Sequence, residues 1–142
     1  MPKMPLEPAG KKLEPSRSRS EPGSLMSERT LLVQRTLRSG QSINYPGHVV
    51  VLGDVNPGAE VRAGGHVMVL GNLRGTVHAG AWGDERAVVV AFRLQPTQLR
   101  IAHLISRSPD EGQEPQEPEI ARISDGLVVI EPYFGFAEGK AW

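Results

Sequence analysis

His48-Val-Val-Val-Leu-Gly-Asp-Val55 recurs as His66-Val-Met-Val-Leu-Gly-Asn-Leu73, with an identical or chemically related residue at every position. A degenerate third copy, Val88-Val-Val-Ala-Phe-Arg-Leu94, follows. Repeats in this chain are spaced by about 16 to 24 residues, which is typical of units that each form one turn of a coil. Such turns stack at the spacing of neighbouring strands, about 4.8 Å. The repeat therefore predicts a coil of short parallel strands.

A second recurring pattern consists of an apolar, a basic and a small residue followed by glycine. It occurs as Leu37-Arg38-Ser39-Gly40, Val61-Arg62-Ala63-Gly64 and Val77-His78-Ala79-Gly80, with a last trace at Leu99-Arg100-Ile101-Ala102. We align these segments as one corner of the coil, because a corner needs the unusual backbone angles that glycine adopts.

This alignment has two consequences for polar residues. Gln41 falls opposite Gly65 and Ala81, so the coil itself has no need of glutamine there, and we predict that Gln41 serves a partner. The basic residues form one column across the strands, which is mildly destabilising. Carboxylates such as Glu60 or an acidic partner would neutralise this column; alternatively, it is a solvated strip without consequence.

The composition agrees with a chain of short strands and tight turns. Sixteen glycines and 12 prolines accompany few aromatic residues among the 142 residues. No segment carries an apolar period of 3.6 residues long enough for a core helix. We therefore expect an all-β fold, a single-stranded coil of parallel strands.

Composition also divides the chain into segments. Residues 1–26 are rich in Pro, Ser and charged residues and predict a disordered N-terminal tail, because they contain little that could be buried. Residues 27–36 are expected to be a linker, residues 37–134 the coil domain, and residues 135–142 a C-terminal tail. Within the domain, the segment Ile120–Pro132 predicts a closing strand pair with a turn at Asp125-Gly126.

The valine-rich strands are apolar at both parities, whereas a half-buried strand is apolar only at alternate positions. One parity must line the interior, and the other leaves an exposed apolar patch. We predict that a second copy of the same face covers this patch in a homodimer. The alternative is that the C-terminal segment folds back over it. The predicted interface residues are Val50, Leu52, Met68, Leu70 and Val89.

Several classes of function find no support in the sequence. The net charge is zero, which indicates no nucleic-acid partner, and there is no cysteine for a disulfide, a nucleophile or a metal site. The longest apolar run, residues 87–92, is far shorter than the roughly 20 residues of a membrane span. The four histidines lack metal-ligand spacing, and no phosphate-binding glycine loop is present. We expect no enzymatic activity, no cofactor, no metal and no membrane insertion.

Three motifs together resemble the C-terminal domain of the septum site-determining protein family MinC. They are Arg38-Ser39-Gly40-Gln41, Pro57-Gly58-Ala59-Glu60, and the run from Gly71 to Asp84, which includes Ala-Gly-Ala-Trp-Gly-Asp. The resemblance implies a right-handed β-helix that dimerises and binds MinD, the ATP-bound, membrane-associated ATPase. It also implies that the contact with MinD involves Arg38, Ser39, Gly40 and Gln41.

The implied function is regulation of cell division, in which the protein contributes to inhibiting assembly of the FtsZ ring at wrong sites. The implied location is the cytoplasm, with recruitment to the inner membrane through MinD. Members of the family usually carry an N-terminal domain that antagonises FtsZ, so the short polar segment before Leu37 places contact with FtsZ in doubt. A rival resemblance is to the bactofilins, self-assembling cytoskeletal β-helix proteins with Pro-rich ends, which lack the motifs quoted above.

Overall fold

The computed structural model describes residues 29–106 and 115–135 of the chain, and every regular element in these ranges is a β-strand. The strands form two sheets. Sheet A contains β1 (Thr30–Val33), β3 (His48–Val51), β5 (Val67–Leu73), β7 (Val89–Leu94), β10 (Glu119–Ser124) and β11 (Leu127–Pro132), in that spatial order. Sheet B contains β2 (Ser42–Tyr45), β4 (Glu60–Ala63), β6 (Thr76–Ala79), β8 (Gln98–Ile101) and β9 (Leu104–Ser106).

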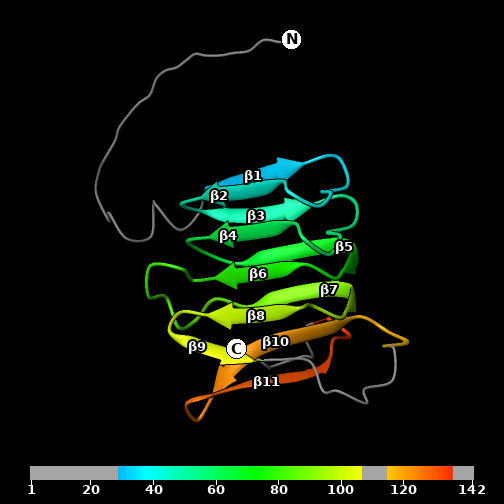
Figure 1. Ribbon diagram of the computed structural model, residues 1–142. Helices are drawn as coiled ribbons and strands as arrows, with labels where there is room; N and C mark the ends of the chain where they lie inside the picture. The colour runs from blue at the N-terminus through cyan, green and yellow to red at the C-terminus, as the bar shows by residue number, and fades with distance from the viewer. Residues whose placement is uncertain (1–28, 107–114, 136–142) are drawn as a thin grey trace.

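The strands alternate between the two sheets as the chain coils downward (Figure 1). Each coil contributes one strand to each sheet: β1 and β2 form the first coil, β3 and β4 the second, β5 and β6 the third, and β7 and β8 the fourth. Strands of successive coils pair in parallel, as in the pairing of β1 with β3 and of β2 with β4. In Figure 1 the chain runs along β1 at the back, turns to the front and returns along β2 while it descends. This path makes the coil right-handed. The predicted fold class, a short right-handed β-helix, is confirmed.

A third side of the coil is made by irregular segments rather than by long strands. Leu37, Val55 and Leu73 lie above one another there, joined by isolated parallel bridges. All three are fully buried, like Val61 and Val77 on sheet B. Branched aliphatic side chains suit this interior because they pack well on a pleated surface. The core is therefore a set of aliphatic columns that run down the axis of the coil.

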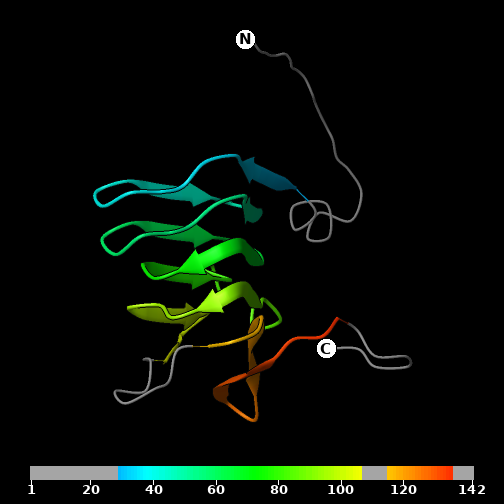
Figure 2. The ribbon, with the colours of Figure 1, turned by 90° about the vertical axis from the view of Figure 1, so that its right-hand side faces the viewer.

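The far end of the stack is closed by antiparallel strands. β10 pairs with β7 and with β11, and β8 pairs with β9 (Figure 2). The turn between β10 and β11 has positive φ at both Asp125 (53°) and Gly126 (78°), as a two-residue hairpin requires. The predicted closing strand pair is thus confirmed. Residues 120–132 extend sheet A as its last two strands and leave Leu32, Met68 and Phe92 exposed, so this part of the chain does not fold back over the whole face of the sheet.

The structure changes one part of the predicted alternation. Val49, Val67 and Val69 line the interior, and Met68 faces outward. Val89, however, pairs with Val67 and is fully buried, so the prediction that Val89 belongs to the outer, interface-forming face is wrong. Its neighbour Val90 takes the position on the outer face, since it pairs with Met68, but its side chain is only 7 % exposed. The error arose because the third copy of the repeat was aligned one residue out of step.

The boundaries also differ from those predicted. The coil begins at Thr30, inside the segment that was expected to be a linker, because β1 pairs with β3 along its whole length. The expectation of a disordered tail at residues 1–26 lies outside the described residues. The same holds for residues 136–142 of the predicted C-terminal tail.

Candidate partner-binding site and apolar face

The four residues of the Arg-Ser-Gly-Gln motif form one exposed turn in the first coil, just before β2. The N–H of Gln41 donates to the carbonyl of Arg38 at 2.9 Å, which closes the turn. Gly40, at the third position, has φ of +90°, and this position of a type II turn favours glycine. The structure therefore brings Arg38, Ser39, Gly40 and Gln41 together on the surface, which a site for a partner requires.

The second coil repeats this turn directly beneath the first. The N–H of Ala59 donates to the carbonyl of Asn56 at 2.9 Å, and Gly58 has φ of +89°. The two turns are joined by the N–H of Gly40, which donates to the carbonyl of Gly58 at 3.0 Å. A Cβ atom on Gly58 would overlap with the side chain of Ser39. Ser39 therefore rests on Gly58, and the turn of the second coil supports the turn of the first.

The side chain of Gln41 lies back over its own turn. Its Oε1 atom accepts a hydrogen bond from the backbone N–H of Arg38 at 2.8 Å and a longer one from Nη1 of Arg35 at 3.4 Å. Arg38 is exposed, and the described residues show no ion pair at its guanidinium group. The turn thus exposes the guanidinium group of Arg38 to solvent. The side chain of Gln41 fixes the backbone at this residue through its hydrogen bond with the Arg38 N–H.

These contacts correct the predicted alignment of the repeat. The residue equivalent to Gly40 is Gly58, not Gly64 or Gly80, since Leu37 stacks on Val55. The basic column on sheet B contains Arg62, His78 and Arg100, with Asn44 rather than Arg38 at its head. The pattern of apolar, basic, small and glycine residues occurs at two different corners of the coil, and sequence alone did not separate them.

The basic column is partly covered. The guanidinium group of Arg62 lies over the ring of Trp82, 5.0 Å from its centroid, and Trp82 is itself 59 % exposed. His78 is buried, and its Nε2 atom lies 3.0 Å from the carbonyl oxygen of Ala102. Burial lowers the pKa of His78, and the hydrogen bond to Ala102 opposes this shift. The middle of the column is therefore a neutral, hydrogen-bonded imidazole at neutral pH.

A histidine ladder, His48 and His66, occupies the corner that leads into sheet A. The two rings stack with centroids 4.7 Å apart and planes 8° apart. Nδ1 of His48 accepts the N–H of His66 at 2.9 Å, and Nδ1 of His66 accepts the N–H of Val88 at 3.0 Å. Both Nδ1 atoms must therefore be unprotonated. The equivalence of the two histidines in the repeat is confirmed, and structure explains them.

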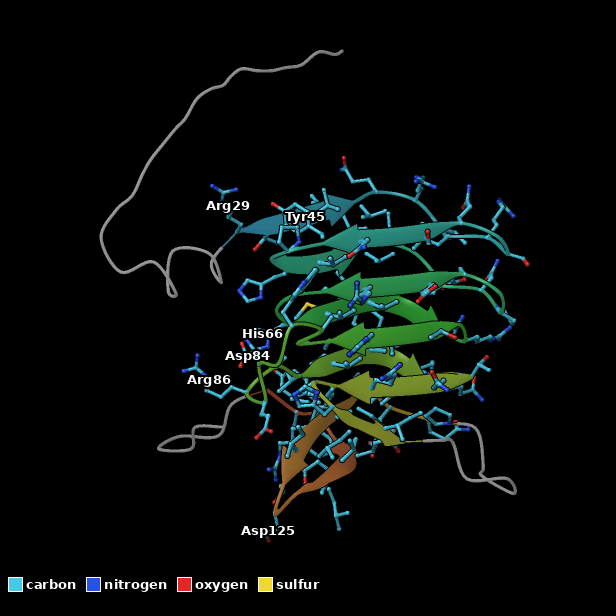
Figure 3. The ribbon with its side chains drawn as sticks, turned by 60° about the vertical axis from the view of Figure 1, so that its left-hand side comes forward. Arg29, Tyr45, His66, Asp84, Arg86 and Asp125 are labelled. Atoms are coloured by element: carbon cyan, nitrogen blue, oxygen red, sulfur yellow. The ribbon has the colours of Figure 1, made fainter. Side chains whose placement is uncertain are left out.

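The surroundings of His66 favour its neutral form. Burial lowers its pKa most, and the imidazole of His48 and the guanidinium of Arg86 lower it further, while Asp84 raises it. Asp84 and Arg86 lie on the same side of the molecule as His66, in the loop between β6 and β7 (Figure 3). Nearly parallel rings cannot aim two nitrogen lone pairs at one ion. The described residues also contain no group of three or more His, Cys, Asp or Glu side chains suited to a metal.

The outer face of sheet A carries a continuous apolar stripe. Leu32, Val50, Met68 and Val90 lie across it in register. Its exposed large side chains are Leu32 (52 %), Leu52 (39 %), Met68 (36 %), Leu70 (36 %) and Phe92 (47 %). Four of the five predicted interface residues, Val50, Leu52, Met68 and Leu70, thus belong to strands or turns of this face.

Sequence reasoning missed two members of the stripe. Leu32 precedes the recognisable repeat, and only its pairing with Val50 reveals its place. Phe92 was missed for the same reason that Val89 was misplaced: with the third copy of the repeat aligned one residue out of step, Val90 and Phe92 fall on the interior parity. The sequence shows that both residues are apolar, but it does not show on which face of the sheet their side chains lie.

These features define a class of protein: a small parallel β-solenoid with an exposed cationic turn at one end and an exposed apolar face along one side. In the part of the chain that the structure describes, no helix is long and apolar enough to cross a membrane. Such surfaces are suited to contacts with other proteins.

Comparison with known proteins identifies the family. The profile described as "Septum formation inhibitor MinC, C-terminal domain" matches residues 31–133. The chain belongs to this family, and the match favours it over the resemblance to bactofilins.

Relatives and a solved structure agree with this assignment. The chain is 68 % identical over 107 residues to the probable septum site-determining protein MinC of Heliobacterium modesticaldum, covering 75 % of this chain and 37 % of that protein. It is 59 % identical over 105 residues to the MinC of Clostridium novyi, covering 74 % of this chain and 50 % of that protein. The chain therefore spans half or less of the length of these relatives.

One structural neighbour is a chain in the MinC:MinD cell division protein complex of Aquifex aeolicus. It superposes with a TM-score of 0.73 at 42 % identity, covering 77 % of this chain and 90 % of that one. The fold described above is thus the fold of a protein solved in complex with its division partner.

Proposed function

We propose that this chain is a non-enzymatic adaptor of cell division that binds MinD through the turn Arg38–Gln41. The observation that carries the proposal is the exposed turn itself, in a chain 42 % identical to a chain of the Aquifex aeolicus MinC:MinD complex. Arg38 supplies the charge of the contact, because it is exposed and its guanidinium can form paired hydrogen bonds with a carboxylate. Ser39 and Gly40 let a partner approach the backbone closely.

The same proposal includes a homodimer formed through the outer face of sheet A. The face carries a continuous stripe of apolar side chains, and a two-fold axis through it would pack the same side chains of two identical copies against one another. A second copy would cover Leu32, Met68 and Phe92, which are more than one-third exposed in the single chain. Two MinD-binding turns would then be linked in one particle, and linked sites increase avidity.

In the cell this adaptor would contribute to keeping the FtsZ ring from assembling at wrong sites. It would be cytoplasmic and reach the inner membrane through ATP-bound MinD. The chain would need no cofactor of its own, since the ATP belongs to the partner. Contact with FtsZ is a further part of the proposal, and it would be tested by adding FtsZ polymers to the MinD complex and measuring co-sedimentation.

Retention of the chain on immobilised cognate MinD, with ATP and with ADP, tests the proposal. We expect retention that requires ATP and is lost in Arg38→Ala. Arg100→Ala is the matched control, because it removes the same charge from the exposed face of sheet B. Equal loss from both variants would indicate non-specific charge attraction, and retention of Arg38→Ala at the wild-type level would exclude this turn as the site.

A further inference from the structure

The first coil has a hydrogen-bonding requirement that later coils do not share. On the third side of the solenoid, the N–H of Asn56 donates to the carbonyl of Leu37 at 2.9 Å. One coil further down, the N–H of Arg74 donates to the carbonyl of Val55 at 2.8 Å. In each case the donor is the residue that follows the bridged core position. These N–H groups therefore point toward the coil above.

The equivalent residue in the first coil is Arg38, which follows Leu37. Its N–H points in the same direction, and in the part of the chain that the structure describes no coil precedes β1. The acceptor comes instead from the side chain of Gln41, whose Oε1 lies 2.8 Å from the Arg38 nitrogen. The amide oxygen of Gln41 thus does for Arg38 what the carbonyls of Leu37 and Val55 do for Asn56 and Arg74 in the following coils.

The same oxygen also meets the guanidinium of Arg35, 3.4 Å from Nη1. Oε1 of Gln41 therefore links Arg35, in the segment that leads into the turn, to the backbone N–H of Arg38, the first residue of the turn. The residue beneath Gln41 in the second coil is Ala59, and no side-chain acceptor is needed there because the N–H of Asn56, which corresponds to that of Arg38, donates to the carbonyl of Leu37 in the coil above. The requirement for glutamine is specific to the first coil.

We infer that Gln41 is a positioning residue, which caps the turn of the first described coil and thereby orients Arg38 for its partner, rather than contacting the partner itself. This inference rests on the proposed binding of MinD. In this role Gln41 needs only a side-chain oxygen that accepts a hydrogen bond. A direct contact would instead use the NH₂ group of the amide, which the cap leaves unused.

Substitution by alanine and by glutamate separates the two roles. Gln41→Ala removes the acceptor, so binding of ATP-loaded MinD should weaken about tenfold, as expected for one lost hydrogen bond that orders a contact residue. Gln41→Glu keeps an oxygen at the same distance along the side chain and should restore binding. Gln98→Ala, on β8 of sheet B, is the control and should bind like the wild type.

A second readout does not involve the partner. Hydrogen exchange of the Arg38 amide, measured by NMR on the free chain, should be faster in Gln41→Ala and slow again in Gln41→Glu. Wild-type binding by Gln41→Ala would overturn the inference. So would a Gln41→Glu variant in which the Arg38 amide is protected but binding stays as weak as in Gln41→Ala, because the amide would then be a direct contact. Absence of MinD binding by the wild type would overturn the proposed function and the positioning role together.

Discussion

Two glycines in stacked turns offer a test of the register between the first two coils. Gly40 and Gly58 have nearly the same backbone angle, φ of +90° and +89°. A Cβ atom on Gly40 would meet nothing within 4 Å, whereas one on Gly58 would overlap with Ser39. Alanine at either position therefore suffers the same backbone strain, but only alanine at position 58 also suffers a steric clash.

The magnitudes follow from these two terms. Strain from a left-handed backbone angle costs about 1–2 kcal/mol, so Gly40→Ala should lower the free energy of unfolding by that amount. Gly58→Ala should lower it by about 1–3 kcal/mol more, which is the usual cost of overpacking. In a Ser39→Gly background most of the additional cost should vanish, since the two overlapping side-chain atoms are gone and only the Cα atom of residue 39 stays near, at 3.2 Å.

Urea denaturation followed by circular dichroism would give the free energy of unfolding of each variant. Comparison of Gly58→Ala in the wild-type and Ser39→Gly backgrounds completes a double-mutant cycle. Equal losses for Gly40→Ala and Gly58→Ala would refute the stacking of the two turns. An additional loss at position 58 that persists in the Ser39→Gly background would refute Ser39 as its cause.

Two further predictions concern the apolar face and the histidine ladder. Met68→Lys should give a folded monomer by light scattering, whereas Val89→Glu should unfold the chain because Val89 is fully buried; a dimeric Met68→Lys would contradict the shared face. Folding lowers the pKa of His66, so below pH about 6.5 the unfolded chain binds a proton more readily than the folded chain. The contribution of His66 to the free energy of unfolding should therefore be complete above this pH and decrease as the pH falls below it. His66→Asn, whose side-chain oxygen can replace the Nδ1 acceptor, should flatten this dependence in urea titrations at several pH values, and an unchanged pH dependence would assign it to other groups.

The coil of strands was predictable because the repeat is long and nearly perfect over two copies. Copies that begin at His48 and His66 carry the same apolar and glycine positions, and a short unit that recurs at such a spacing indicates stacked turns of a coil. The closing hairpin was equally clear from Asp125-Gly126, since these residues adopt positive φ at low cost.

Register and corner identity were not predictable to the same degree. Val89 was placed on the outer face because its repeat is degenerate, and a slip of one residue reverses every side chain. The corner at Gly40 was aligned with that at Gly64 because both carry an apolar, a basic and a small residue followed by glycine. Only the pairing of Leu37 with Val55 distinguishes them. The role of Gln41 was hidden because it depends on which acceptor the N–H of Arg38 finds in the folded chain, and this is set by the stacking of the coils.

The central claim is that MinD docks on the turn Arg38–Gln41 at the start of the solenoid. Because the sequence contains no cysteine, a single introduced cysteine can carry a thiol-linked photo-crosslinker at one defined position. Ser39→Cys places the probe in the turn, and Leu127→Cys places it on exposed β11 at the other end of sheet A. With ATP-loaded cognate MinD, we predict a crosslink from position 39 and none from position 127. A crosslink from position 127 alone, or equal crosslinks from both, would contradict it.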